Sequence, residues 1–343
     1  MNGLLATTVL LLGCSLSLPA VASLERERLF EVAASVLKIE VVRQQGGYSI
    51  GSGVVVADGV VVTNCHVTQS AVSINVLRGD QRWRVEAQAR DAVHDLCLLR
   101  VPRLGAPRVT LGRSAELKNG QVVAAVGFTG GQSLQSSTGK VIELHRLDGG
   151  YVIQSDNWFS SGASGGALFD EQLRLVGVLT FRLRGGLLHY FASPVEWLAP
   201  LLADSQAFRP VAPAGLAGPA DLYYWQRQPP MQPAFLQAAA LLRDSKWTEL
   251  EALARRWSES DADDPAPWNA LARALDGLGR LGAAAAALEQ SLKLAPTAGP
   301  AWLHLGQLAL RQGERAKAQA IRQQLEALDP TLAASLVLPA TGP

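Results

Sequence analysis

The sequence predicts an all-β region followed by an all-α region. Between residues 32 and 198, short runs of Val, Leu and Ile alternate with Gly, Asp and Asn, which is typical of many short antiparallel strands in a sandwich or in closed barrels. Seven of the 18 prolines lie between residues 200 and 233 and indicate a linker that lies against one domain or both. Beyond this linker the sequence repeats every 34 residues, as paired helices do.

Three residues of the β region together predict a catalytic site. His66 ends one apolar run, Asp95 begins another, and Ser164 lies in a Gly-rich run, at separations of 29 and 69 residues. A serine hydroxyl is a weak nucleophile, so it needs an imidazole to take its proton and a carboxylate to orient that imidazole. Each residue alone would fit a turn or an ordinary buried position, but the set in this order predicts catalysis. His94 is expected to point to the opposite side of a strand and to take no part.

The region from residue 32 to residue 198 resembles the trypsin/chymotrypsin superfamily, and within it the bacterial HtrA-like (Deg) branch. The resemblance covers about half of the chain and implies two six-stranded barrels with a site in the cleft between them. It implies that His66 is the general base, that Asp95 orients it, and that Ser164 attacks the peptide carbonyl without any cofactor or metal. The segments that carry the resemblance are residues 51–56, 60–66, 122–127, 153–156, 161–168, 175–178 and 191–194.

The loop before the serine would supply the second half of the chemistry. The backbone N–H groups of Gly162 and Ser164 would form the oxyanion hole, and glycine suits a sharp turn close to substrate. Trypsin-like enzymes carry an acid just before the nucleophile and HtrA-like enzymes usually carry Asn, whereas this chain has Ala163. Activation by an ion pair with a freshly cut N-terminus is therefore excluded, and the loop must be ordered in another way.

Four residues are candidates for the wall of the substrate pocket: Trp158, Phe159, Leu179 and His189. In the resembled fold the pocket base lies about six residues before the serine, which is Trp158 here. No acid lies at that position, so a preference for Lys or Arg is not expected. The aromatic residues would favour a small or medium apolar side chain, unless they are simply core. His189 could recruit an acidic side chain, although a lone strand histidine is more often structural.

Two cysteines lie beside the candidate base and acid. Cys65 immediately precedes His66, and Cys97 lies two residues after Asp95. Because His66 and Asp95 must approach within hydrogen-bond distance, their strands are neighbours and the two thiols would lie close together. In an oxidising compartment they could form a disulfide, and the alternative is a pair of small buried thiols in the barrel wall. Geometry decides between the two.

The N-terminus resembles an export signal. Residues 4–18 form an apolar run of 15 that is short for a membrane span, and residues 19–23 contain an A-x-A-like cleavage site. We expect cleavage after Ala22 and a periplasmic or secreted protein. The alternative is a lipoprotein anchored through Cys14, which ends a lipobox-like run, and a third possibility is a retained anchor. Contact with a membrane is expected only in these last two cases.

The repeated segment resembles tetratricopeptide repeats, and a degenerate unit from about residue 231 to residue 264 brings the number to about three. Such arrays bind extended peptides or partner helices on their concave face. Asn269, Arg273 and Gln307 are candidates for that contact, and the alternative is a solvated polar face. The equivalent pairs include Trp268 and Trp302, Leu271 and Leu305, Gly279 and Gly313, and Ala284 and Ala318.

The charge balance argues against nucleic acid or an anionic surface as a partner, since 31 basic residues face 30 acidic ones. We expect a signal peptide over residues 1–22, a trypsin-like serine protease domain over 23–202, a Pro-rich linker over 203–230 and a tetratricopeptide repeat domain over 231–335.

The expected protein is an exported serine endopeptidase that uses a His-Asp-Ser triad and an acyl-enzyme, with repeats that dock a substrate or partner protein. One alternative is a latent or inactive protease-fold scaffold whose repeats mediate protein–protein interaction. A second alternative is an ester hydrolase, because the same triad serves both reactions.

Overall fold

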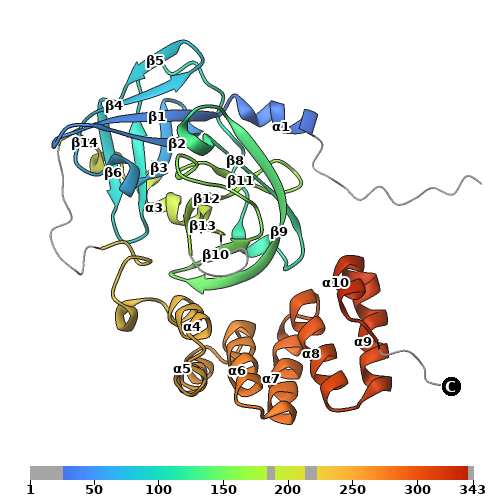
Figure 1. Ribbon diagram of the computed structural model, residues 1–343. Helices are drawn as coiled ribbons and strands as arrows, with labels where there is room; N and C mark the ends of the chain where they lie inside the picture. Colours follow the sequence, from blue (N-terminus) through green and yellow to red (C-terminus); the bar gives the residue numbers. More distant parts are fainter. Residues whose placement is uncertain (1–25, 184–189, 213–221, 339–343) are drawn as a thin grey trace, which may run out of the picture.

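The computed structural model describes residues 26–183, 190–212 and 222–338 (Figure 1). Strands occupy most of the chain up to residue 210 and helices occupy the rest, so the predicted fold class is confirmed. The predicted signal peptide, Cys14 and His189 lie outside the described residues. Within the described part of the chain, no helix combines the length and the apolar character needed to cross a membrane.

The first sheet contains eight strands in the order β14-β6-β7-β3-β2-β1-β4-β5 and follows a short helix, α1 (Arg26–Ala33). Its core face comes from the period of two along each strand: in β1, Leu37, Ile39 and Val41 are buried. The strands are β1 (Val36–Arg43), β2 (Tyr48–Ala57), β3 (Val60–Asn64), β4 (Ala71–Arg78), β5 (Gln81–Arg84), β6 (Ala87–Asp91), β7 (Leu96–Arg100) and β14 (Arg209–Pro210).

This first sheet differs from the six-stranded barrel that the resemblance implied. Residues of the predicted linker add a strand to it, because Arg209 pairs with Gln88 and Pro210 with Ala87 at the edge of β6. A proline has no N–H to donate, so β14 is suited to an edge and ends the sheet there. The linker is therefore part of the β fold at this point.

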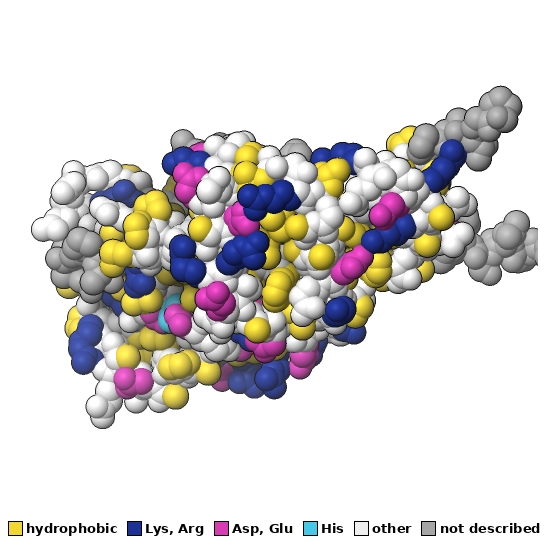
Figure 2. Space-filling view, turned by 90° about the horizontal axis from the view of Figure 1, so that it is seen from below, with side chains coloured by type: hydrophobic (Ala, Val, Ile, Leu, Met, Phe, Trp, Pro, Cys, Tyr) yellow, Lys and Arg dark blue, Asp and Glu magenta, His cyan; other side chains and the backbone are white. Residues whose placement is uncertain are grey.

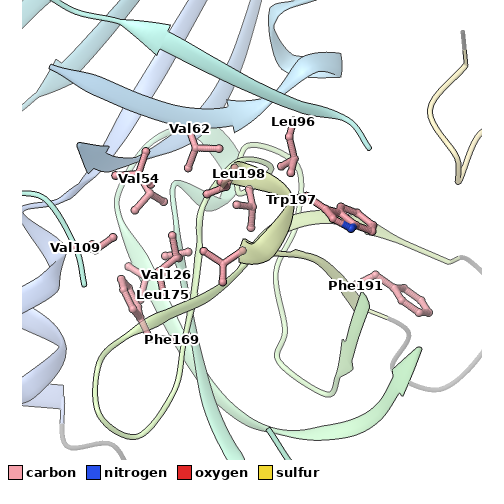
Figure 3. Packing of buried hydrophobic residues seen from close by; sticks show 14 of the residues in the cluster. Val54, Val62, Leu96, Val109, Val126, Phe169, Leu175, Phe191, Trp197 and Leu198 are labelled. Carbon is pink, nitrogen blue, oxygen red and sulfur yellow. The ribbon is translucent and has the colours of Figure 1, made fainter. Parts of the chain in front are cut away.

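The second sheet is a closed barrel in the order β10-β13-β12-β11-β8-β9. Its strands are β8 (Val122–Gly127), β9 (Gln135–Leu147), β10 (Gly150–Ser155), β11 (Ala167–Phe169), β12 (Leu175–Arg182) and β13 (Tyr190–Pro194). The two sheets share one apolar core, in which Val54, Val62 and Leu96 of the first pack with Val126 and Phe169 of the second (Figure 3). This shared core fixes the two sheets relative to each other.

Three helical hairpins follow the barrels, with one further helix packed on the last hairpin (Figure 1). The connection within each hairpin contains a residue of positive φ: Ser245 at 51°, Gly279 at 74° and Gly313 at 78°. These residues recur every 34 positions, so the first, degenerate unit has the same turn as the others, with a serine in place of glycine. The helices are α4 (Ala234–Arg243), α5 (Trp247–Ser260), α6 (Pro265–Gly277), α7 (Leu281–Leu294), α8 (Gly299–Arg311), α9 (Arg315–Leu328) and α10 (Pro330–Ser335).

The helical array lies against β9 of the second barrel (Figure 1). An apolar contact anchors its first helix, because the ring of Phe235 stacks on that of His145 with 4.3 Å between centroids. On the face of the molecule in Figure 2, acidic and basic side chains are interspersed. Three polar contacts join the array to β9: Lys140 Nζ to Asp329 Oδ2 (2.5 Å), Arg146 Nη1 to Asp263 Oδ1 (2.9 Å), and Asn269 Nδ2 to Glu143 Oε1 (3.3 Å).

Candidate active site

His66 and Asp95 form a hydrogen-bonded pair. His66 lies in the short helix α2 (Cys65–Thr68), and its Nδ1 is 2.6 Å from Asp95 Oδ2, while its backbone N–H donates to Asp95 Oδ1 at 2.8 Å. The Asp95 side chain is fully buried and that of His66 is 24% exposed. An ionised carboxylate can only accept hydrogen bonds, so it places the imidazole proton on Nδ1 and leaves Nε2 to take a proton from a nucleophile.

The backbone around Asp95 directs its carboxylate toward His66. Asp95 has a φ of 60°, which aspartate tolerates better than most residues, and it immediately precedes β7. Its carbonyl oxygen accepts hydrogen bonds from Asn64 Nδ2 at 3.0 Å and from the backbone N–H of Cys65 at 3.2 Å. The backbone carbonyl group and the carboxylate of Asp95 are therefore both held by the segment that runs from the end of β3 into α2.

Cys65 and Cys97 form a disulfide, so the structure decides between the two alternatives left open by the sequence. Cys97 pairs with Thr63 in the β3–β7 ladder, which brings the two cysteine Cα atoms within 5.0 Å. Both cysteines are buried and pack against Tyr223. The segment that carries His66 is therefore tied covalently to the strand that follows Asp95.

Ser164 lies before β11 and is held by the first sheet. Its carbonyl oxygen accepts a hydrogen bond from the backbone N–H of Ser52 in β2 at 2.8 Å. Gly51 lies between the serine and the histidine segments: a Cβ there would be 2.5 Å from Val67 Cγ1 and 3.2 Å from the Ser164 carbonyl oxygen. Among the described residues, Ser164 Oγ makes no hydrogen bond, and catalytic hydrogen bonds are often long without substrate.

Ser52 is a part of this site that was not among the residues predicted from the sequence. Its hydroxyl donates to the carbonyl oxygen of Gly162 at 2.7 Å and accepts from the backbone N–H of Phe128 at 2.8 Å. One serine of the first sheet thus joins the serine loop to the end of β8. The only sequence signal is a buried polar residue between two glycines in an otherwise apolar strand.

The backbone at Gly162 has a conformation that favours glycine. Its φ is 96°, and a Cβ at this position would lie 2.4 Å from the Phe128 carbonyl oxygen and 2.8 Å from the Gly131 nitrogen. Only glycine fits without a shift of the backbone. Within the described part of the chain, the N–H groups of Gly162 and Ser164 donate to no protein acceptor, so both are available to an anionic oxygen.

Ala163 is fully buried and points into the second barrel, where it packs with Phe159 and Ile153. A carboxylate at this position would be buried without a partner, which is strongly unfavourable. Apolar packing orders the loop in place of an ion pair, together with backbone hydrogen bonds such as that from Gly130 N–H to the Ser161 carbonyl oxygen (2.7 Å).

Three of the four predicted pocket residues, Trp158, Phe159 and Leu179, line one small cavity of about 40 Å³. Trp158 is 53% exposed, whereas the other two are buried. The other lining residues are Ala125, Gly127, Thr129, Gln135, Ser136 and Ser137, so no lining side chain is charged. A larger cavity of about 610 Å³, beside Trp83 and Pro210, contains none of the candidate catalytic residues, so we do not assign the chemistry to it.

Two aromatic residues of the predicted linker also reach the site. The indole N–H of Trp225 donates to Asp95 Oδ2 at 3.1 Å. The rings of Trp225 and Tyr223 lie edge-on to His66, with centroids 5.8 and 6.2 Å away. Both residues lie in the predicted linker, and the aromatic run to which they belong, within a Pro-rich segment, is the sequence signal that could have pointed to this contact.

His94 is a neighbour of the site that takes part in a different contact. Its Nδ1 is 2.5 Å from Asp91 Oδ2 and its Nε2 is 3.0 Å from Asp148 Oδ2. Burial opposes protonation of His94, but the hydrogen bonds to Asp91 and Asp148 outweigh burial and raise its pKa. The ring stacks on Trp197, so His94 joins the turn before β7 to the turn between β9 and β10.

The three candidate peptide-binding residues of the array have different surroundings. Asn269 is half-buried and bonded on both sides, to Glu143 of β9 and to Ser291 Oγ of α7 at 3.0 Å. Arg273 and Gln307 are exposed. The barrel therefore occupies Asn269, and only the other two residues are open to a partner.

Comparisons with known proteins agree with this arrangement. The family described as a trypsin-like peptidase domain matches residues 51–178, and the tetratricopeptide repeat family matches residues 266–297, which cover α6 and α7. The active form of the Rv3671c protease from M. tuberculosis is similar in structure, with a TM-score of 0.50 and 25% identity over 55% of this chain and 88% of that one.

Curated relatives are similar over about half of this chain. The "Probable periplasmic serine endoprotease DegP-like" of Ectopseudomonas mendocina is 38% identical over 45% of this chain and 34% of the relative. "Serine protease HTRA1B" of Danio rerio is 30% identical over 51% of this chain and 40% of the relative. The chain thus spans between a third and two fifths of the length of these relatives.

Proposed function

We infer that this protein is a serine endopeptidase. The chain contains a trypsin-like peptidase domain and a tetratricopeptide repeat, and it is similar to DegP-like and HTRA serine proteases. The observation that carries this proposal is the buried Asp95 carboxylate 2.6 Å from His66 Nδ1, with the Ser164 loop held across the sheet interface. This arrangement leaves Nε2 of His66 as the base.

The reaction we propose proceeds in two halves. His66 Nε2 takes the proton of Ser164 Oγ as that oxygen bonds to the peptide carbonyl carbon, and the N–H groups of Gly162 and Ser164 bind the oxyanion. The imidazolium, stabilised by Asp95, then gives its proton to the leaving amine, which leaves an acyl-enzyme. Water then attacks the ester carbonyl carbon while His66 takes its proton, and His66 gives that proton to Ser164 Oγ as the ester bond breaks, which releases the acid product and restores the serine.

The preferred substrate side chain at the cleaved bond is small and uncharged. The cavity formed by Trp158, Phe159 and Leu179 is small, about 40 Å³, and contains no charge to pair with Lys or Arg. A small apolar side chain fits this cavity best.

We propose the periplasm as the compartment. The Ectopseudomonas mendocina relative is named as periplasmic, and the buried disulfide suits an oxidising environment. We propose the division that the sequence suggests, with a signal peptide over residues 1–22, a protease domain over 23–202, a linker over 203–230 and repeats over 231–335 that bind a substrate or partner protein.

Labelling with a fluorophosphonate probe tests this function, since the probe reacts only with an activated serine. We expect wild-type protein to be labelled and Ser164→Ala to be unlabelled, with cleavage of unstructured peptides lost in parallel. Ser161→Ala removes an exposed serine of the same loop and should be labelled normally. Absence of wild-type labelling between about pH 6 and 9 would instead support the inactive scaffold. Labelling with turnover of esters but not peptides would support the ester hydrolase.

A further inference from the structure

We propose that Trp225 is a positioning residue for the catalytic acid, so that the segment after the barrels completes the hydrogen bonding of Asp95. This inference rests on the proposed function. Both oxygens of the Asp95 carboxylate accept hydrogen bonds: Oδ1 accepts from the backbone N–H of His66, and Oδ2 accepts from His66 Nδ1 and from Trp225 Nε1. A fully buried carboxylate needs such donors, because each unpaired lone pair is costly in an apolar surrounding.

The barrels supply no substitute for the indole. Two buried hydroxyl groups lie near Asp95, those of Thr180 in β12 and Ser193 in β13, but their hydrogen bonds go to groups other than its carboxylate. Thr180 Oγ1 donates to the Val178 carbonyl oxygen at 2.7 Å and lies 3.0 Å from Ser193 Oγ. Among the described residues, the only donors to the Asp95 carboxylate are His66 and Trp225.

The indole is held in place by contacts that do not involve Asp95. Its ring stacks on Phe181 of β12, with 5.1 Å between centroids and 10° between planes. The Trp225 carbonyl oxygen accepts from Gln232 Nε2 at 3.0 Å, and the backbone N–H of the neighbouring Tyr224 donates to the Val93 carbonyl oxygen at 2.9 Å. A phenylalanine at position 225 would keep an aromatic ring against Phe181 and lose the N–H, together with part of the indole surface, and the control described below loses the same surface.

Tyr223 shields the same region from water. It is fully buried against the disulfide, and burial, together with the negative charge of Asp95, raises its pKa. The ring therefore stays neutral beside His66. With Tyr223 covering the disulfide and Trp225 bonded to the acid, this segment forms a wall of the base and acid half of the site.

This wall connects the triad to the helical array. The chain runs from Trp225 through residues 226–233 into α4, whose Phe235 stacks on His145 of β9. The segment is thus anchored on the second barrel at one end and on the catalytic acid at the other. A loss of the indole contact would affect the orientation of Asp95 without removing any residue that touches substrate.

The test is Trp225→Phe in the full-length protein. We expect the rate constant for fluorophosphonate labelling to fall about 10-fold, because a hydrogen bond to a buried charge is lost, while the final labelled fraction stays at the wild-type value. The pH midpoint of labelling, which reports the imidazole of His66, should move upward, since the carboxylate charge is then shared with one donor fewer. With a peptide, kcat should fall and KM should stay unchanged.

Trp302→Phe is the matched control, because it also removes an indole hydrogen bond, from Nε1 to the Pro296 carbonyl oxygen at 2.8 Å, within the array. Its labelling should equal that of wild type. The proposal is overturned if Trp225→Phe has the wild-type rate and midpoint, or if only its labelled fraction falls, as a folding defect would cause. If wild type itself is not labelled, the proposed function fails. The NMR titration of His66 in wild type and Trp225→Phe then decides the positioning role alone.

Discussion

The two halves of the candidate site are fixed by different means. On the side of the first sheet, His66 and Asp95 are joined by side-chain hydrogen bonds, supported by a disulfide and covered by aromatic rings. On the side of the second barrel, Ser164 is placed by backbone hydrogen bonds and by glycines, and its own side chain makes no hydrogen bond among the described residues.

This difference fits the roles that we propose for the two halves. The base must keep one tautomer and one orientation through both steps of the reaction, so permanent partners suit it. The nucleophile and the oxyanion donors must exchange partners with each substrate, so a permanent protein partner would compete with substrate. The serine loop is therefore ordered by hydrogen bonds to its carbonyl oxygens, by the burial of Ala163 and by the positive φ of Gly162. These contacts leave the backbone N–H groups of Gly162 and Ser164 without a protein acceptor among the described residues.

The largest expected effect comes from breaking the fixed half with Asp95→Asn. The new amide can donate an N–H to His66 Nδ1, which would then carry no proton, so the proton of the neutral imidazole would lie on Nε2. In that tautomer His66 cannot act as the base, and we expect kcat to fall by about 10⁴-fold. Asp91→Asn makes the same chemical change in the carboxylate that pairs with His94 and should keep its activity. A loss smaller than about 10-fold in peptide cleavage by Asp95→Asn would contradict the assignment of the acid.

Gly162→Ala disturbs the open half and should have the next largest effect. The new Cβ would collide with the Phe128 carbonyl oxygen and shift the N–H of residue 162 from the oxyanion, which should lower kcat by about 10²- to 10³-fold. Gly149→Ala is the control for backbone strain alone, because Gly149 also has a positive φ (78°) but a Cβ there would meet no other atom within 4 Å. Equal losses of kcat in the two variants would argue against an oxyanion role for Gly162.

The smallest effect is expected from His94, which belongs to neither half. Its pKa is raised in the folded state, so its pairing stabilises the fold fully below the unfolded value of about 6.5 and loses this contribution as pH rises through the folded pKa. His94→Gln should therefore lower Tm by a few degrees more at pH 5.5 than at pH 8.5, with labelling unchanged. A larger deficit at the higher pH would contradict this sign.

The sequence predicted the parts of this site that depend on local patterns. The positions of His66, Asp95 and Ser164 relative to apolar runs, and the glycine before the serine, are local features. The neighbouring strands of Cys65 and Cys97 could also be inferred, but not their bond, since that depends on the orientation of two side chains.

The parts that could not be predicted depend on contacts between distant segments. Ser52 bonds to a residue 110 positions away, and Trp225 reaches an acid 130 positions away. The Pro-rich composition predicted a linker laid against one domain or both, but not where it is bound: Arg209 pairs with β6 at the edge of the first sheet, and Tyr223 is buried against the disulfide. The 34-residue repeat predicted that Asn269 lies on the first helix of a repeat, but it could not predict the hydrogen bond from Asn269 to Glu143 of β9.

Strand β9 has one consequence of its own for the ionic environment of the protein. Its first residues, Gln135, Ser136 and Ser137, border the small cavity, and its later residues bind the array through partly exposed polar contacts such as Lys140 with Asp329. Partly exposed ion pairs weaken as dissolved salt shortens the Debye length, which is about 8 Å at physiological ionic strength. The stacking of Phe235 on His145 is not screened in this way. We therefore expect rising salt to weaken the contact between Lys140 and Asp329, at the far end of the array, more than the contact between Phe235 and His145 at its first helix.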